Sequence, residues 1–107
     1  MMLGCPHDAA GFALLQCILA DRLGVKPGIY THSISNAHIY DDHFEAAREL
    51  IGRAHIHQPI ALQVPPGSYG RAVAGDTQLV EELFASLDSQ YKPLEPIKGM
   101  KITVNVY

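Results

Sequence analysis

His38 and Tyr40, in the segment NAHIYDDH, are the two residues best suited by type and spacing to bind a ligand. They are two positions apart, so in a strand both side chains point to the same side. An imidazole and a phenol side by side can bind a hydroxyl group, because each can donate and accept a hydrogen bond. The spacing equally fits a partly buried histidine beside a cross-strand tyrosine, and spacing alone favours that structural interpretation.

The chain has six histidines, which raises the question of a metal site. His38 and His43 are five residues apart, and His55 and His57 flank a single isoleucine. Neither pair forms an HExxH motif, and no cysteine is close to them in sequence. We therefore predict no metal site. A Ser/His/Asp triad can be assembled on paper from the same region, but no nucleophile-elbow motif supports it.

The composition predicts a single globular domain spanning residues 1–107. Hydrophobic residues make up 48% of the sequence and charged residues 18%, which argues against disorder. The net charge of -3 leaves no basic stripe for nucleic acid, and Asp21 and Arg22 interrupt the longest apolar run. There is no basic n-region of a signal peptide, and Cys5 and Cys17 form no disulfide framework. These features predict a cytoplasmic protein that binds neither nucleic acid nor membrane.

Three segments have the composition and periodicity of helices. In the first, residues 8–23, Asp8 is the expected N-cap and Gly24 the expected terminator. Apolar residues occupy nearly every face of this segment, a pattern typical of a helix buried inside a larger body. Two amphipathic helices are expected over residues 42–54 and 76–89, the latter with Asp76 as its cap.

Three further segments have the composition or alternation of strands. They are residues 28–40, 60–64 and 100–106, and residues 65–75 between them are expected to form a loop because of their Pro and Gly content. The predicted fold class is therefore α+β, with a buried helix 8–23 packed against a small mixed sheet. Two other helices and a small sheet can cover only part of a helix that is apolar on nearly every face. We therefore expect helix 8–23 to be buried further in an oligomer.

Two consecutive segments resemble a known family. LGCPHDAAGFALL, followed by GVKPGIYTHSISNAHIYDDH, is similar to the C-terminal half of thymidylate synthases and of the related deoxycytidylate and cytidylate hydroxymethylases. In that family LGxPxNxAxxxxL begins a long buried helix, and GxxPGxxxH and DxHxYxxH follow. The spacing fits without a gap over residues 3–43. The later segment PIKGMKI resembles the closing strand of the family more weakly.

The resemblance implies roles for four residues. His38 and Tyr40 match the pair that binds the sugar hydroxyl of the nucleotide, and Asn36, as a possible supporting residue, replaces the usual Asp. Asp8 replaces the Asn that recognises the pyrimidine. An ionised carboxylate only accepts hydrogen bonds, so Asp8 suits the amino group of cytosine, as in the hydroxymethylases. The implied ligand is a pyrimidine nucleoside monophosphate, with CMP or dCMP favoured over dUMP. Helix capping alone is the alternative role for Asp8.

The resemblance also implies what this chain lacks. The nucleophilic cysteine of the family lies in a PxCH segment, followed by an RSxD phosphate-binding segment, and both precede the matched region. Neither Cys5 nor Cys17 matches that nucleophile, so no catalytic residue is expected in this chain. The family is homodimeric and uses 5,10-methylenetetrahydrofolate, which we do not expect the isolated chain to bind. Two interpretations stay open: part of a one-carbon transferase, or a non-catalytic remnant serving nucleotide binding or oligomerisation. A third is an unrelated small α/β domain.

Overall fold

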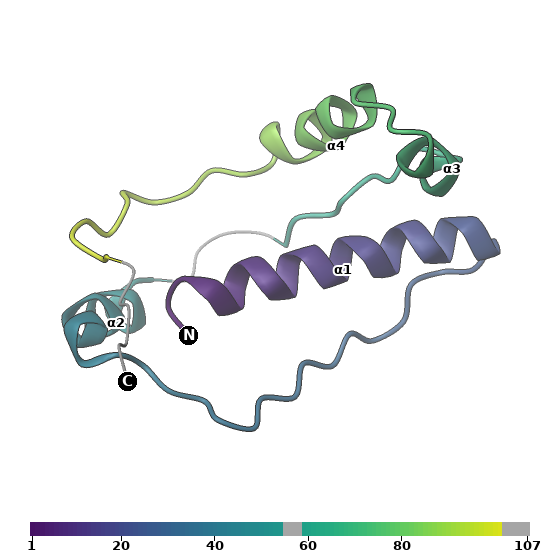
Figure 1. Cartoon of the computed structure of the whole chain (residues 1–107). Coiled ribbons are helices and arrows are strands. Elements are labelled where there is room, and N and C mark those ends of the chain that lie inside the picture. Colours follow the sequence, from purple (N-terminus) through teal and green to yellow (C-terminus); the bar gives the residue numbers. More distant parts are fainter. Residues whose placement is uncertain (55–58, 102–107) are drawn as a thin grey trace.

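The computed structural model describes residues 1–54 and 59–101, and these residues form helices and irregular connections (Figure 1). No strand occurs within those two ranges, so the prediction of an α+β fold with a small mixed sheet is wrong. The elements, in chain order, are α1 (Gly4–Leu23), the 3-10 turn η1 (Asp41–His43), α2 (Phe44–Gly52), α3 (Ser68–Val73) and α4 (Gln78–Asp88).

Within residues 1–54 and 59–101, the segments predicted as strands find no strand partner. Residues 28–40 run as an irregular connection. Residues 60–64 are hydrogen-bonded to side chains in and just after α4: Gln90 pairs with both the N–H and the carbonyl of Ala61, and Ser86 Oγ accepts the N–H of Gln63 at 2.9 Å. β-propensity mainly reflects packing against neighbouring strands, so without a partner these residues stay irregular. Of the predicted C-terminal strand, residues 102–107 lie outside the described residues.

Helix α1 begins four residues earlier than predicted. Its N-cap is Leu3, so Asp8 lies inside the helix and the prediction that it caps the helix is wrong. The predicted end is confirmed, because Gly24 takes a left-handed conformation with φ of 68°. The N–H of Gly24 donates to the carbonyl of Asp21 at 3.2 Å and that of Val25 to Ala20 at 3.0 Å. A residue without a Cβ suits this conformation.

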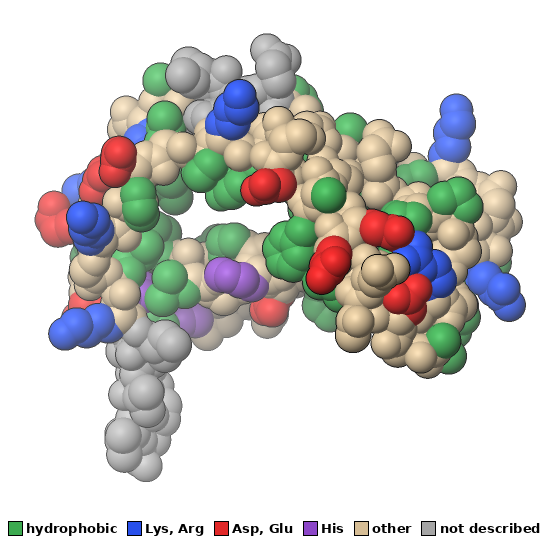
Figure 2. Space-filling model, turned by 90° about the horizontal axis from the view of Figure 1, so that it is seen from above, with side chains coloured by type: hydrophobic (Ala, Val, Ile, Leu, Met, Phe, Trp, Pro, Cys, Tyr) green, Lys and Arg blue, Asp and Glu red, His purple; other side chains and the backbone are tan. Residues whose placement is uncertain are grey.

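The predicted burial of α1 is also wrong within this chain. Ala20, at 6% exposure, is the one buried residue of α1, whereas Phe12 is 58% exposed and Leu23 is 73% exposed. The radius of gyration is 16.8 Å, against about 13 Å for a compact domain of 100 residues. In Figure 2 apolar side chains border an opening between the elements. Of the described helices, α3 is the one that contacts α1, so most of α1 is left uncovered.

The other helices are arranged around the two ends of α1 (Figure 1). α3 contacts α1 and α4, and the connection 24–40 leads back along α1 to η1 and α2. The predicted helices 42–54 and 76–89 are confirmed as η1–α2 and α4, with bounds that differ by a few residues. The predicted loop 65–75 instead contains α3, which starts after Gly67, a glycine with φ of 76°.

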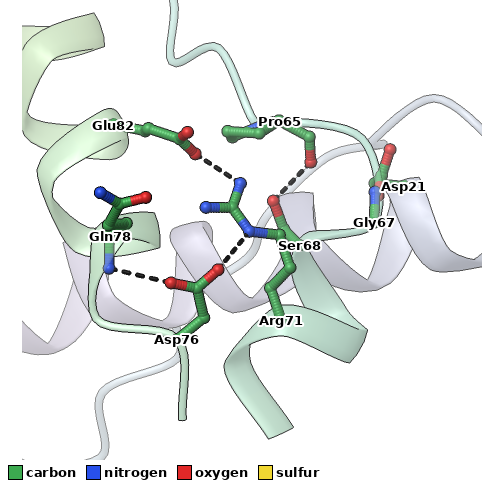
Figure 3. Close-up of polar contacts among 8 residues, drawn as sticks. All are labelled: Asp21, Pro65, Gly67, Ser68, Arg71, Asp76, Gln78 and Glu82. Atoms are coloured by element: carbon green, nitrogen blue, oxygen red, sulfur yellow. Dashed lines mark hydrogen bonds and ion pairs between the residues drawn. The ribbon is translucent and has the colours of Figure 1, made fainter. Parts of the chain in front are cut away.

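A polar cluster joins α1, α3 and α4 (Figure 3). Asp21 on α1 accepts the N–H of Gly67 at 3.0 Å, which ties the start of α3 to the end of α1. Arg71 on α3 donates through Nε to Asp76 at 2.8 Å and also pairs with Glu82 on α4. Asp76 further accepts the N–H of Gln78 at 3.0 Å, but the N-cap of α4 is Thr77, so the prediction that Asp76 is the N-cap is wrong by one residue.

The cluster makes the stability of the α3–α4 pair depend on pH. The hydrogen bond from Arg71 lowers the pKa of Asp76, with a smaller contribution from the N–H of Gln78. A lowered pKa stabilises the fold above the unfolded value, about 3.9, and this stability is lost as the pH falls below it. We expect thermal unfolding followed by circular dichroism to show a lower Tm at pH 3 than at pH 6. Asp76→Asn should flatten this acid dependence, whereas Asp88→Asn at the end of α4 should keep it.

Candidate functional site

A pocket of about 600 Å³ lies where the first turn of α1 meets the start of α2. This volume falls within the range of small-molecule sites. The N-terminal residues bring thioether and aliphatic groups to the pocket, and the histidines and the tyrosine bring polar ones. The lining residues are Met1, Met2, Leu3, Gly4, His7, Tyr40 and His43.

The predicted pair, His38 and Tyr40, lies together although no strand holds it. The two ring centroids are 5.3 Å apart, and the rings meet edge to face at 73°. The ring of Tyr40 makes a similar contact with His43, at 5.9 Å and 74°. Tyr40 is therefore held between two imidazoles, an arrangement that aromatic quadrupoles favour. These contacts fix the phenol ring at the edge of the pocket.

Three histidines near the pocket have one ring nitrogen committed to a backbone carbonyl. His7 Nδ1 donates to Leu3 at 2.7 Å, His38 Nδ1 to Asn36 at 2.8 Å, and His43 Nε2 to Lys101 at 2.8 Å. A carbonyl oxygen only accepts, so the committed nitrogen must carry the proton. In the neutral ring the other nitrogen is therefore an acceptor. The predicted supporting residue, Asn36, acts here through its backbone carbonyl.

The structure and the sequence differ on which residue of α1 faces the pocket. Asp8 is exposed and is not among the lining residues, whereas its neighbour His7 is. His43 is only 3% exposed and joins α2 to residue 101 through its hydrogen bond. Sequence reasoning missed His7 and weighed His43 only as a metal ligand. The sequence did contain a signal for each contact. His7 follows Leu3 by four residues and His43 follows Tyr40 by three, which are the spacings of neighbours on one helical turn.

The cysteines lie away from this pocket. Both are half-buried free thiols on α1, and neither lines the pocket. Cys5 and Cys17 are twelve residues apart, about 18 Å along a helix axis. Residues 1–54 and 59–101 contain no group of three or more His, Cys, Asp or Glu side chains that could hold a metal ion.

A second hollow, of about 410 Å³, runs between α1 and residues 25–30. Most of its lining is apolar, including Phe12, Leu15, Leu19, Leu23 and Val25.

The few polar groups of this hollow do not fit a folate. Gln16 Nε2 donates to the carbonyl of Gly28 at 3.2 Å, the hydroxyl of Tyr30 is hydrogen-bonded to His32 at 2.8 Å, and Lys26 offers only donors. The pterin ring of methylenetetrahydrofolate presents several N–H groups that need acceptors, because a polar group buried without a partner is costly. The side chains of this lining offer only the oxygens of Gln16 and Tyr30 as acceptors, so the lining fits the pterin ring poorly.

Within the described ranges, no helix is both long enough and apolar enough to span a lipid bilayer.

Comparison with known proteins shows the family. The thymidylate synthase family model matches residues 1–81, which include the pocket, Asp8 and the His38–Tyr40 pair. No solved structure matches the chain. Members of this family take part in nucleotide biosynthesis as transferases, bind pyrimidine nucleotides and use methylenetetrahydrofolate. Because the match covers well over half of its length, the chain belongs to the thymidylate synthase family.

Proposed function

We propose that this chain is the C-terminal nucleotide-recognition part of a pyrimidine nucleotide C5 one-carbon transferase, most similar to a cytidylate or deoxycytidylate hydroxymethylase. The observation that carries the proposal is Asp8, which lies within the matched region. The resemblance of the LGCPHDAAGFALL segment implies that it replaces the asparagine of the family. The contact between the rings of His38 and Tyr40 supports the sugar-binding part of the proposal.

The sugar hydroxyl would bind between His38 and Tyr40. With Nδ1 of His38 donating to a carbonyl, its Nε2 can accept the proton of a hydroxyl group. The phenol of Tyr40 can in turn donate to the oxygen of the same hydroxyl. The neighbouring ring of His43 limits the movement of the Tyr40 ring, so little conformational entropy is lost on binding.

The base would be recognised from the first two turns of α1. The carboxylate of Asp8 is exposed there and is able to accept a hydrogen bond from the amino group of cytosine. The carbonyl oxygen at the same position of uracil would face the carboxylate without a proton between them. Cytidylate or deoxycytidylate is therefore the favoured ligand.

The chemistry at C5 would depend on groups outside this chain. In the family a cysteine thiolate attacks C6 of the pyrimidine, and neither Cys5 nor Cys17 lines the pocket. The folate would supply the one-carbon unit to a complete enzyme. The role of these residues is to bind and orient the nucleotide, and we expect the isolated chain to bind without turnover.

A non-catalytic role in nucleotide binding or oligomerisation is the second candidate, favoured by the exposed apolar side chains of α1. Leu15 is 46% exposed and Leu19 is 40% exposed, one turn apart on the helix. Covering them in a homodimer would remove apolar surface from water, and each Å² removed would stabilise the dimer by about 25 cal/mol. A chain that sediments as a monomer at high micromolar concentration would contradict the homodimer.

Binding of CMP to the full chain tests the proposed site. We expect Tyr40→Phe, which removes only the hydroxyl, to weaken CMP binding about two- to tenfold, the value of one hydrogen bond. Tyr91→Phe, at a tyrosine that is 60% exposed and does not line the pocket, is the matched control and should leave the affinity unchanged. Titrations followed by NMR would measure both. Equal affinities for wild type and Tyr40→Phe would contradict the sugar-binding role.

A further inference from the structure

We propose that His7 is a base-contacting residue that makes the pocket select an amino-bearing pyrimidine. The inference rests on the proposed function and adds a residue to it. His7 lines the pocket together with Tyr40, whereas Asp8 does not. Of these two neighbours on α1, His7 is therefore the residue whose side chain would meet a ligand in the pocket.

The hydrogen bond of His7 fixes what its ring can offer. Nδ1 lies 2.7 Å from the carbonyl oxygen of Leu3, one turn earlier. Because that oxygen can only accept, Nδ1 carries the proton and Nε2 of the neutral ring carries a lone pair. The same bond orients the ring along the helix. His7 thus presents a single, fixed acceptor.

The other walls suit a flat heteroaromatic ring. Met1, Met2 and Leu3 supply thioether and aliphatic surface next to His7. Polarisable thioethers pack well against aromatic rings. A polar edge of a base that enters between such walls loses water, so an unmatched donor or acceptor there is costly. The apolar walls therefore increase the discrimination that one acceptor can provide.

A fixed acceptor distinguishes the two common pyrimidines. The amino group at C4 of cytosine can donate to Nε2 of His7, whereas the carbonyl oxygen at C4 of uracil would face its lone pair. Sites built to pair with a polar group reject the analogue that lacks it more strongly than apolar pockets do. Asp8, the next residue, is likewise only an acceptor when ionised. Two consecutive residues of α1 therefore favour the same base.

The test compares the affinities of the full chain for CMP and UMP at pH 8, where imidazole is largely neutral. His7→Gln replaces the fixed acceptor with an amide that both accepts and donates, and His7→Leu removes the polar group. We expect the UMP-to-CMP ratio of Kd values to fall about tenfold in each variant. In His7→Leu the lower ratio of Kd values should come from weaker CMP binding. His32→Gln, at an exposed histidine outside the pocket, is the control and should keep the ratio.

A second measurement does not depend on how the variants fold. In the wild-type chain, CMP should shift the ¹⁵N resonance of His7 Nε2 as it accepts a hydrogen bond, and UMP should not. An unchanged Kd ratio in both His7 variants, or an unmoved resonance, overturns the inference. The Tyr40→Phe variant separates this failure from that of the proposed function. If Tyr40→Phe still weakens CMP binding, only His7 is excluded. If no nucleotide binds the wild type, both proposals are overturned.

Discussion

Replacing Asp8 with asparagine should move the nucleotide preference of the chain from cytidylate toward uridylate, by about ten- to a hundredfold in the ratio of affinities. An asparagine amide can donate to the carbonyl oxygen at C4 of uracil, which a carboxylate cannot. Asp8 is exposed in the free chain and would lose water under a bound base. A polar group left there without a partner costs about 1–3 kcal/mol, and this cost would pass from uridylate to cytidylate on substitution. Calorimetry of both nucleotides against both variants measures the ratio.

The alternative role of Asp8 gives a different outcome. Asp8 lies within α1 and Leu3 is the N-cap, so the carboxylate does not cap the helix. α1 has no acidic residue in its first turn, and the interaction with the helix dipole falls off within that turn, so Asp8→Asn should change stability by about 0.5 kcal/mol or less. The matched control is Asp88→Asn on α4, which should leave the preference for cytidylate over uridylate unchanged. Equal preference in wild type and Asp8→Asn would remove the cytosine assignment.

Truncating Leu79 to alanine should cost about 2–5 kcal/mol of folding stability, the largest effect we expect on the fold. Leu79 is 4% exposed, the lowest value among the buried apolar residues within the described ranges. The other three are alanines, so a leucine side chain supplies most of the apolar volume that is removed from water. Urea unfolding followed by circular dichroism at 222 nm would measure the loss.

The neighbouring valine provides the control for this experiment. Val80 is 52% exposed on the same turn of α4, and Val80→Ala should change stability by about 0.5 kcal/mol or less. Alanine has the higher helix propensity in both cases, and the gain is larger for the β-branched Val80 than for Leu79. Equal losses in the two variants would show that Leu79 does not anchor the packing of α4.

Local sequence signals predicted most of the helices and one end of α1. Periodicity located α2 and α4 within a few residues, and Gly24 ended α1 as expected. Asp76, predicted as the cap of α4, instead precedes the N-cap Thr77 and binds the N–H of Gln78. The rings of His38 and Tyr40 lie together as predicted, although the strand on which that prediction rested does not form. These features depend on residues within a turn or two of one another, which the sequence itself brings together.

Only the tertiary structure decided the remaining features, because they depend on partners far away in the chain. Residues 60–64 have strand-like composition, but their backbone groups are satisfied by Ser86 and Gln90. α3 forms in a segment rich in Pro and Gly, where Asp21 of α1 binds the N–H of Gly67. The early start of α1 placed His7 in the pocket and left Asp8 exposed beside it.

The sequence by itself therefore determined where most of the helices form and which family the residues resemble. The tertiary structure determined whether a strand-like segment has a partner, how much of α1 is covered and which side chains line the pocket. The physical reason is that helix hydrogen bonds join residues four apart, whereas sheet pairing, burial and pocket walls require contacts between distant segments. In the described chain such contacts are few, so an apolar pattern along α1 did not lead to burial.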